Sequence, residues 1–280
     1  MGIKITTLSE NTATAGGCIA EWGLSILVEM DNLRLLLDTG ASFSAVHNAQ
    51  LFGVDLTTID KIVLSHGHYD HTGGLKEVLR RSGPIEIVAH PGVWEDKCFV
   101  GELNGQRIER YVGIPFRREQ IEGLGGQFQF SREPVWITED MVTSGEVPLI
   151  TEYEEVDPDM YVREDGVFRP DTLSDDLSLA IKTELGLVIL LGCAHRGMIN
   201  IIRHFQQITD TELIYCVIGG THLLRASEER LALTTADLRE TGVQRLGVSH
   251  CTGFGASVWL SREFPSEFFM NNAGSRFTLF

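Results

Sequence analysis

The motif H-x-H-x-D-H at residues 66–71 places three imidazoles and one carboxylate within six positions. Imidazole nitrogens and carboxylate oxygens are ligands that Zn²⁺ and similar divalent ions accept, and donors packed this closely favour a shared cation. When the protein supplies fewer ligands than the metal can hold, a coordination position stays open for water. The motif therefore predicts a catalytic metal site built on His66, His68, Asp70 and His71, with Asp70 also a candidate catalytic group.

The segments on either side of the motif predict where it lies in the fold. Asp60 to Ser65 has the composition of a short apolar strand, and Gly74 to Arg81 has helical spacing that ends at Gly83. The metal ligands are therefore expected on a strand-to-helix turn. Such a turn holds reactive groups on a rigid scaffold and leaves them open to substrate.

The rest of the chain alternates strands with helices in two halves, which implies a layered α/β architecture. In the first half we expect a hairpin around Asp31-Asn32, a helix and a further strand, at residues 24–30, 33–37, 43–51 and 85–89. In the second half we expect another hairpin and then alternating helices and strands, at residues 177–181, 187–191, 198–207, 213–218, 227–241 and 245–249.

A middle segment at about 95–173 has weaker periodicity, with a basic stretch followed by an acidic one. It is interpreted as an irregular insertion, either a solvated face or a lid that contacts substrate. With 280 residues and 43% hydrophobic content, the chain can bury a large core, so we expect a single domain over residues 1–280.

Composition narrows the partners. The net charge of −16 argues against nucleic acid, whose phosphates are neutralised by Lys and Arg. No apolar run approaches the roughly 20 residues needed to cross a bilayer. Five irregularly spaced cysteines suggest no disulfide framework, so we expect a cytoplasmic protein. We expect no membrane partner and no nucleic-acid partner, and a homo-oligomer stays open.

Three later turns resemble the metal turn in design, since each follows an apolar strand and contains glycine. They lie at residues 192–197, 219–222 and 250–255. Turns of this kind expose backbone N–H groups and a helix N-terminus, which favour anions such as phosphate. If the strand ends converge on one edge, the turns and the metal form a single basin suited to an anionic small-molecule substrate.

The sequence resembles the metallo-β-lactamase superfamily, whose members carry this motif on an αββα sandwich. Within it, the chain is similar to the 7,8-dihydropterin-6-yl-methyl-4-(β-D-ribofuranosyl)aminobenzene 5′-phosphate synthases. The shared features run along nearly the whole chain: the metal motif itself and the segments Trp22–Ser25, Leu37–Gly40, Gly192–His195, Gly219–Leu223 and His250–Gly253. The resemblance implies a four-layer α/β fold that binds one or two divalent metals, Zn above all, with Mn, Fe or Mg as alternatives.

The resemblance also implies a division of the ligands. His66 and His68 hold one metal, with His195 as the candidate third ligand because it follows a core strand on the same expected edge. Asp70 and His71 hold the second metal, completed by His250.

Many superfamily members bridge their metals with an aspartate, but this chain has Gly192-Cys193 at the corresponding place. Cys193 can serve as a soft ligand, Asp175 or Asp176 can approach from the preceding strand, or a single metal binds tightly. These alternatives stay open at the level of sequence.

Several polar residues near the turns are candidates for substrate contact: His90, Arg196, Thr221, His222 and Thr252. Arg196 is expected to pair with a phosphate. The resemblance favours an enzyme that acts on a phosphorylated or diphosphorylated small molecule. The alternatives are a hydrolase of phosphodiesters, lactones or thioesters, and a non-catalytic sensor that binds metal and ligand.

Overall fold

The computed structural model describes residues 2–103 and 105–280, and one of its two main sheets has seven strands. Their order is β17-β1-β2-β3-β4-β5-β8, and β3, β4, β5 and β8 run parallel. The strands are β1 (Ile3–Ser9), β2 (Ser25–Met30), β3 (Leu33–Leu37), β4 (Lys61–Val63), β5 (Ile85–Ala89), β8 (Gly126–Phe130) and β17 (Arg276–Leu279). The expected hairpin is present, with Asp31 at a φ of 50° in the turn between β2 and β3.

The second main sheet has six strands in the order β16-β15-β14-β13-β12-β9. Strands β13 to β16 run parallel, whereas β12 pairs antiparallel with β13 and with β9. The strands are β9 (Met141–Thr143), β12 (Ser178–Thr183), β13 (Gly186–Leu191), β14 (Ile214–Gly220), β15 (Arg245–Ser249) and β16 (Phe268–Met270). Apart from β9 and β16, these strands lie within a few residues of the expected positions.

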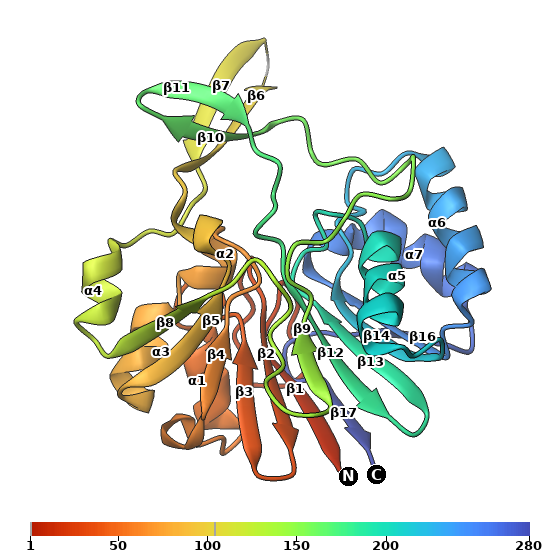
Figure 1. The fold of residues 1–280 in the computed structure, drawn as a ribbon, viewed down its shortest axis with the longest axis horizontal. Coiled ribbons are helices and arrows are strands. Elements are labelled where there is room, and N and C mark those ends of the chain that lie inside the picture. Colours follow the sequence, from red (N-terminus) through yellow and green to blue (C-terminus); the bar gives the residue numbers. More distant parts are fainter. Residues whose placement is uncertain (1, 104) are drawn as a thin grey trace.

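Helices cover the outer face of each main sheet, and the two sheets face each other (Figure 1). On the seven-stranded side lie α1 (Ser44–Leu51), α3 (Leu75–Ser82) and α4 (Arg118–Glu122). On the six-stranded side lie α5 (Met198–Thr209), α6 (Glu228–Thr241) and α7 (Gly253–Glu263). Short helical turns are α2 (Tyr69–Thr72), η1 (Leu56–Thr58), η2 (Pro91–Trp94) and η3 (His250–Thr252).

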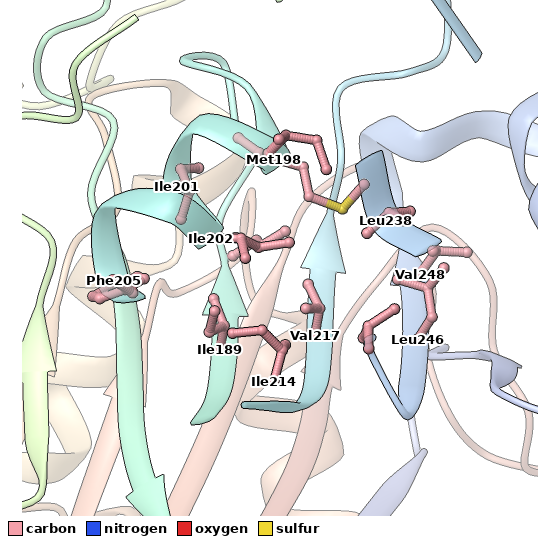
Figure 2. Close-up of a cluster of buried hydrophobic side chains, with 14 of the residues drawn as sticks. Ile189, Met198, Ile201, Ile202, Phe205, Ile214, Val217, Leu238, Leu246 and Val248 are labelled. Atoms are coloured by element: carbon pink, nitrogen blue, oxygen red, sulfur yellow. The ribbon is translucent and has the colours of Figure 1, made fainter. Parts of the chain in front are cut away.

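Three hydrophobic cores separate the four layers. The inner core joins Ile26 and Leu37 of one sheet to Leu190 and Ile218 of the other. An outer core packs α1 and α3 on the seven-stranded sheet. The other packs α5 on β13 and β14, where Phe205 and its neighbours lie above the strands (Figure 2). The αββα sandwich expected from the resemblance is confirmed.

The middle segment differs from the irregular insertion that we expected. It contributes an edge strand to each main sheet, because β8 pairs with β5 and β9 pairs with β12. It also forms a separate four-stranded sheet at the top of Figure 1, in the order β11-β10-β6-β7. These strands are β6 (Lys97–Leu103), β7 (Gln106–Tyr111), β10 (Met160–Glu164) and β11 (Val167–Pro170).

Two further observations concern the described part of the chain. None of its helices has the length and apolar composition needed to span a membrane. All five cysteines are free thiols, and Cys18 is the most exposed of them.

Candidate metal centre

The candidate ligands lie where parallel strands end. His66 and His68 follow β4, and α2 begins directly after them with Asp70 and His71. His195 follows β13 and His250 follows β15, and both of these strands belong to the six-stranded sheet. Because parallel strands present their carboxyl ends at one edge of a sheet, residues far apart in sequence meet here between the two sheets.

The first group of donors consists of His66, His68 and His195. Nε2 of His66 lies 2.9 Å from Nδ1 of His68 and 3.3 Å from Nε2 of His195. All three side chains are buried, and the three ligand atoms lie within 4.8 Å of one another. Ring nitrogens that converge in this way present their lone pairs to one point, as three protein ligands of a divalent metal do.

The second group consists of Asp70, His71 and His250. Nε2 of His250 lies 3.3 Å from Oδ2 of Asp70 and 3.3 Å from Nε2 of His71. These atoms also lie within 4.8 Å of one another and are buried. One carboxylate and two imidazoles fit a divalent ion, so the structure brings together all six residues expected to hold two metals.

Polar partners orient the imidazoles from behind. Nδ1 of His66 lies 2.9 Å from Oγ of Ser65, and Nδ1 of His250 lies 2.9 Å from Oδ1 of Asn11. Such contacts fix the tautomer and ring plane of a metal-binding histidine. The position of Asn11 could not be foreseen, because 239 residues separate it from His250 and no local motif marks the contact.

The protonation of the first donor group and of Asp70 suits metal binding. His71 differs, because the carboxylates of Asp38 and Asp70 outweigh burial and raise its pKa to about 9, so it must release a proton to bind a metal. Burial holds the pKa of His68 at about 3, and burial together with neighbouring histidines lowers the pKa of His66 and His195 well below 6.5. Burial alone would raise the pKa of Asp70, but the charges of His71 and His250 outweigh it and keep that pKa low. At neutral pH the first group is therefore three neutral imidazoles, and Asp70 is ionised, which are the forms that bind metals.

The backbone is unusual around these residues. Asp38, Ala194, His222 and His250 all have φ between 51° and 59°, in the left-handed region that non-glycine residues rarely adopt. Gly67 is required for space, since a Cβ there would lie 2.2 Å from the carbonyl oxygen of Val93. Strained backbone concentrated at one place is typical of a functional site.

Cys193 lies between the two donor groups. Its Sγ is 3.1 Å from Nε2 of His71, and it also lies within 4.8 Å of a ring nitrogen of His195 and of His250. Cys251, which sequence reasoning did not single out as a site residue, joins the group of Cys193 and His250. The position expected to carry a soft ligand therefore lies inside the cluster.

Asp175 does not lie with the donors, which corrects one alternative for a metal ligand. Its Oδ1 is 2.9 Å from Nζ of Lys97, and its Oδ2 accepts a hydrogen bond from the backbone of Gly67 at 2.9 Å. Lys97 also binds Oδ2 of Asp171 at 2.8 Å, and all three side chains are buried. Both carboxylate oxygens of Asp175 are thus engaged, and this ion pair fixes the metal turn to the base of β6. Asp176 is also outside the donor groups, where its Oδ2 accepts from the backbone of Arg196.

Two of the expected substrate contacts, His90 and Arg196, form hydrogen bonds within the protein. His90 is buried, with Nδ1 accepting from the backbone of Gly92 and Nε2 lying 2.9 Å from Glu146. Arg196 donates from Nε to the carbonyl of Val147 and from Nη1 to that of Thr172, so two of its donor atoms hold loops of the protein.

Thr221 and Thr252 contact each other rather than open space. Their hydroxyl oxygens lie 2.9 Å apart, and both residues are buried. This hydrogen bond joins the turn after β14 to η3 and supports the backbone that presents His250.

The expected anion site at the turn of residues 192–197 is occupied by the protein's own carboxylate. Glu154 accepts hydrogen bonds from the backbone of Ile199 at 2.9 Å and of Asn200 at 2.8 Å, at the N-terminus of α5. A helix N-terminus favours negative charge, and here an acidic side chain from the middle segment supplies it.

A cavity of about 410 Å³ adjoins the donors. His222 and Cys251 line it on the metal side, and Nδ1 of His222 is buried without a partner among the described residues. The side chains on the other walls include aromatic, basic and acidic groups, among them Trp22, Phe99, Asp157, Asp159, Arg225 and Arg230. Of the expected substrate contacts, His222 lines this cavity, and Arg196 lines a separate cavity of about 380 Å³.

Known proteins resemble this chain in sequence and in fold. The metallo-beta-lactamase superfamily model matches residues 23–158, from the start of β2 through the metal motif. The 7,8-dihydropterin-6-methyl-4-(beta-D-ribofuranosyl)-aminobenzene-5'-phosphate synthase of Methanocaldococcus jannaschii is 33% identical, over 97% of this chain and 95% of its own. The crystal structure of a metal-dependent hydrolase of the beta-lactamase superfamily matches with a TM-score of 0.85 and 29% identity, covering 98% of both chains.

A more distant likeness extends to the fold alone. The metallo-beta-lactamase fold protein YhfI from Bacillus subtilis covers 100% of both chains with a TM-score of 0.61 and 14% identity. The chain belongs to the metallo-β-lactamase superfamily. Its similarity to the Methanocaldococcus synthase covers nearly the entire chain.

Proposed function

We propose that this protein is a metal-dependent enzyme that acts on a phosphorylated or diphosphorylated small molecule. The observation that carries the proposal is the convergence of two donor groups, His66/His68/His195 and Asp70/His71/His250, beside a cavity of about 410 Å³. A closed structural metal site offers no room for substrate, whereas here His222 and Cys251, which adjoin the donors, line a cavity.

Each donor group holds one divalent metal, Zn²⁺ above all, with Mn²⁺, Fe²⁺ or Mg²⁺ as alternatives. When bound, such ions polarise a phosphoryl oxygen and stabilise charge on a leaving group. Asp70 stays ionised at neutral pH because neighbouring histidines lower its pKa. Its carboxylate therefore binds metal and can also accept a hydrogen bond from an attacking hydroxyl or amine.

The cavity supplies the substrate contacts. The ring of Trp22 packs 5.1 Å from that of His250 and is half exposed, so it offers a flat apolar surface beside the second donor group. Nε of Arg230 is buried without a partner in the described ranges, and a substrate anion would satisfy it. Because the net charge of −16 repels anions overall, local cations such as Arg230 must attract an anionic substrate. The same net charge supports a small-molecule substrate over nucleic acid.

The relatives support two reaction classes. The 33% identity to the synthase, over nearly all of both chains, favours displacement of diphosphate from a pterin by an aminobenzene ribonucleotide. The structural neighbour at 29% identity is a metal-dependent hydrolase, and this favours hydrolysis as the second candidate.

One experiment separates the candidates. Purified protein is assayed for metal content, for diphosphate release from a pterin methyl diphosphate with and without the aminobenzene ribonucleotide, and for cleavage of bis-p-nitrophenyl phosphate. Diphosphate release that requires both substrates supports the synthase, and cleavage of the diester without release supports the hydrolase. Bound metal with neither activity would leave a binding protein and contradict the proposal.

A further inference from the structure

Cys193 lies within reach of ligands from both donor groups. Its Sγ lies within 4.8 Å of the ligand atoms of His66 and His71 in one group, and of His195 and His222 in another. A third group combines it with His250 and Cys251. His66 and His195 belong to the first proposed metal position, whereas His71 and His250 belong to the second. A single sulfur is therefore within reach of both positions.

We infer that Cys193 bridges the two metals as a thiolate. The inference rests on the proposed metal-dependent function and adds a shared ligand to it. Because a thiolate carries several lone pairs on one atom, it can bind two cations at once from the position between them. The sulfur lies 3.1 Å from Nε2 of His71 and within 4.8 Å of donor atoms from both groups.

The neighbouring Cys251 is held differently. Its thiol donates to the carbonyl oxygen of Cys193 at 3.3 Å, and its sulfur accepts a hydrogen bond from the backbone of His222 at 3.3 Å. A Cβ on Gly220 would lie 2.6 Å from this sulfur, so the packing there is tight. Cys251 therefore has both of its hydrogen-bonding roles filled by backbone, and it acts as a positioning residue for the loop that carries Cys193.

The backbone of Cys193 is also fixed. Gly220 donates to the carbonyl of Gly192 at 3.1 Å, and Ala194 has a left-handed φ of 55° that turns the chain towards His195. A ligand held by this many contacts does not need to move to meet a metal. This is the preorganisation that a shared ligand requires.

Metal binding by Cys193 needs no oxidant or reductant. The S–H bond of Cys193 breaks, its proton passes to solvent, and two metal–sulfur bonds form from lone pairs of the same sulfur. No oxidation state changes, since a bound divalent ion deprotonates a coordinating thiol outright. A thiolate ligand also selects among metals, because it favours Zn²⁺, Co²⁺ and Fe²⁺ over the harder Mg²⁺.

The test is a Co²⁺ titration of metal-stripped, full-length protein, followed by near-ultraviolet absorption and by the number of ions bound per chain. A thiolate bound to Co²⁺ gives a sulfur-to-metal charge-transfer band that nitrogen and oxygen ligands do not give. We expect the wild type to show the band and to bind two ions. The variants Cys251→Ser and Cys18→Ser should keep the band, since neither removes the bridging sulfur.

Cys193→Asp is the informative variant, because a carboxylate can also bridge two ions but gives no such band. We expect it to bind two Co²⁺ without the band. Cys193→Ala should bind the second ion at least about tenfold more weakly, as expected for loss of a group that supports a metal. Two ions bound by the wild type without a charge-transfer band, or a band that persists in Cys193→Asp, would overturn the inference and leave the metal function standing. A wild type that binds no Co²⁺ would instead contradict the proposed function itself.

Discussion

Nδ1 of His71 lies 2.7 Å from Oδ2 of Asp38, and both side chains are completely buried. Oδ1 of Asp38 accepts a hydrogen bond from the backbone of Ser65 at 2.7 Å, so the carboxylate joins β3 to the start of the metal turn. Because Nδ1 of His71 faces a carboxylate, its hydrogen lies there and Nε2 is directed towards the metal position, where it can bind once its own proton is released.

Replacement of Asp38 should therefore weaken metal binding although Asp38 is not a ligand. We expect Asp38→Asn to lower the affinity for Zn²⁺ by roughly 10- to 100-fold, because the amide holds the imidazole less firmly. Competition with a chromophoric chelator measures the change. Asp165→Asn is the matched control, since Asp165 also has a left-handed φ but lies in the exposed turn between β10 and β11. Equal affinities for the two variants would contradict this role of Asp38.

The buried ion pair of Lys97 predicts a large effect on stability. Lys97→Met leaves Asp171 and Asp175 as buried carboxylates without a counter-charge, which should lower the free energy of unfolding by about 3–5 kcal/mol. Urea unfolding provides the measurement. Lys4→Met removes an exposed pair with Glu29 and should change the free energy by about 1 kcal/mol or less. A loss for Lys97→Met no larger than that of the control would show that the pair is not needed.

Acid should destabilise the metal-free protein through its buried histidines. Burial holds the pKa of folded His68 at about 3, whereas an unfolded histidine titrates near 6.5. Between these values the unfolded chain binds a proton that the folded chain does not, so the free energy of unfolding falls as the pH drops from about 6.5 towards 3.

The contribution of His68 appears as a slope. The measurement is urea unfolding with chelator at several pH values. As the pH drops through this window, the free energy of unfolding of the wild type should fall by up to about 1.4 kcal/mol per pH unit more than that of His68→Gln. His47→Gln is the control, because His47 lies on the exposed side of α1. Parallel slopes for wild type and His68→Gln would rule out the buried neutral imidazole.

The cavity predicts a change in substrate binding that leaves the metals in place. Trp22→Ala removes the aromatic wall, so we expect KM to rise about tenfold, consistent with the loss of one aromatic contact. Metal content should stay unchanged. Trp136→Ala is the matched control, because both tryptophans are 47% exposed but Trp136 lies outside the cavity lining. An unchanged KM in Trp22→Ala would place substrate elsewhere.

Local patterns were sufficient to predict most of the main elements. The apolar strand before His66 and the helix from Leu75 follow from residue spacing, and the Asp31-Asn32 turn defines its hairpin. The edge strands β8 and β9 were missed because their pairing depends on partners distant in sequence. Strand pairing of this kind reflects the tertiary context more than local preference.

The site divides in the same way. The first four candidate ligands form one local motif, and His195 and His250 follow recognisable strands. By contrast, Asp175 and Arg196 have suitable side chains but are engaged by Lys97 and by backbone carbonyls, which sequence does not reveal. The supporting roles of Asn11 and Lys97 likewise arise only from the folded arrangement.

The central claim is that two divalent ions bind at these six residues, and anomalous diffraction from crystals grown with Zn²⁺ tests it most directly. Data collected on either side of the zinc absorption edge should give two peaks. One peak should lie among His66, His68 and His195, and the other among Asp70, His71 and His250. In crystals of His68→Ala the first peak should disappear while the fold remains. Zinc-grown crystals of the wild type with no peak among these residues would contradict the account.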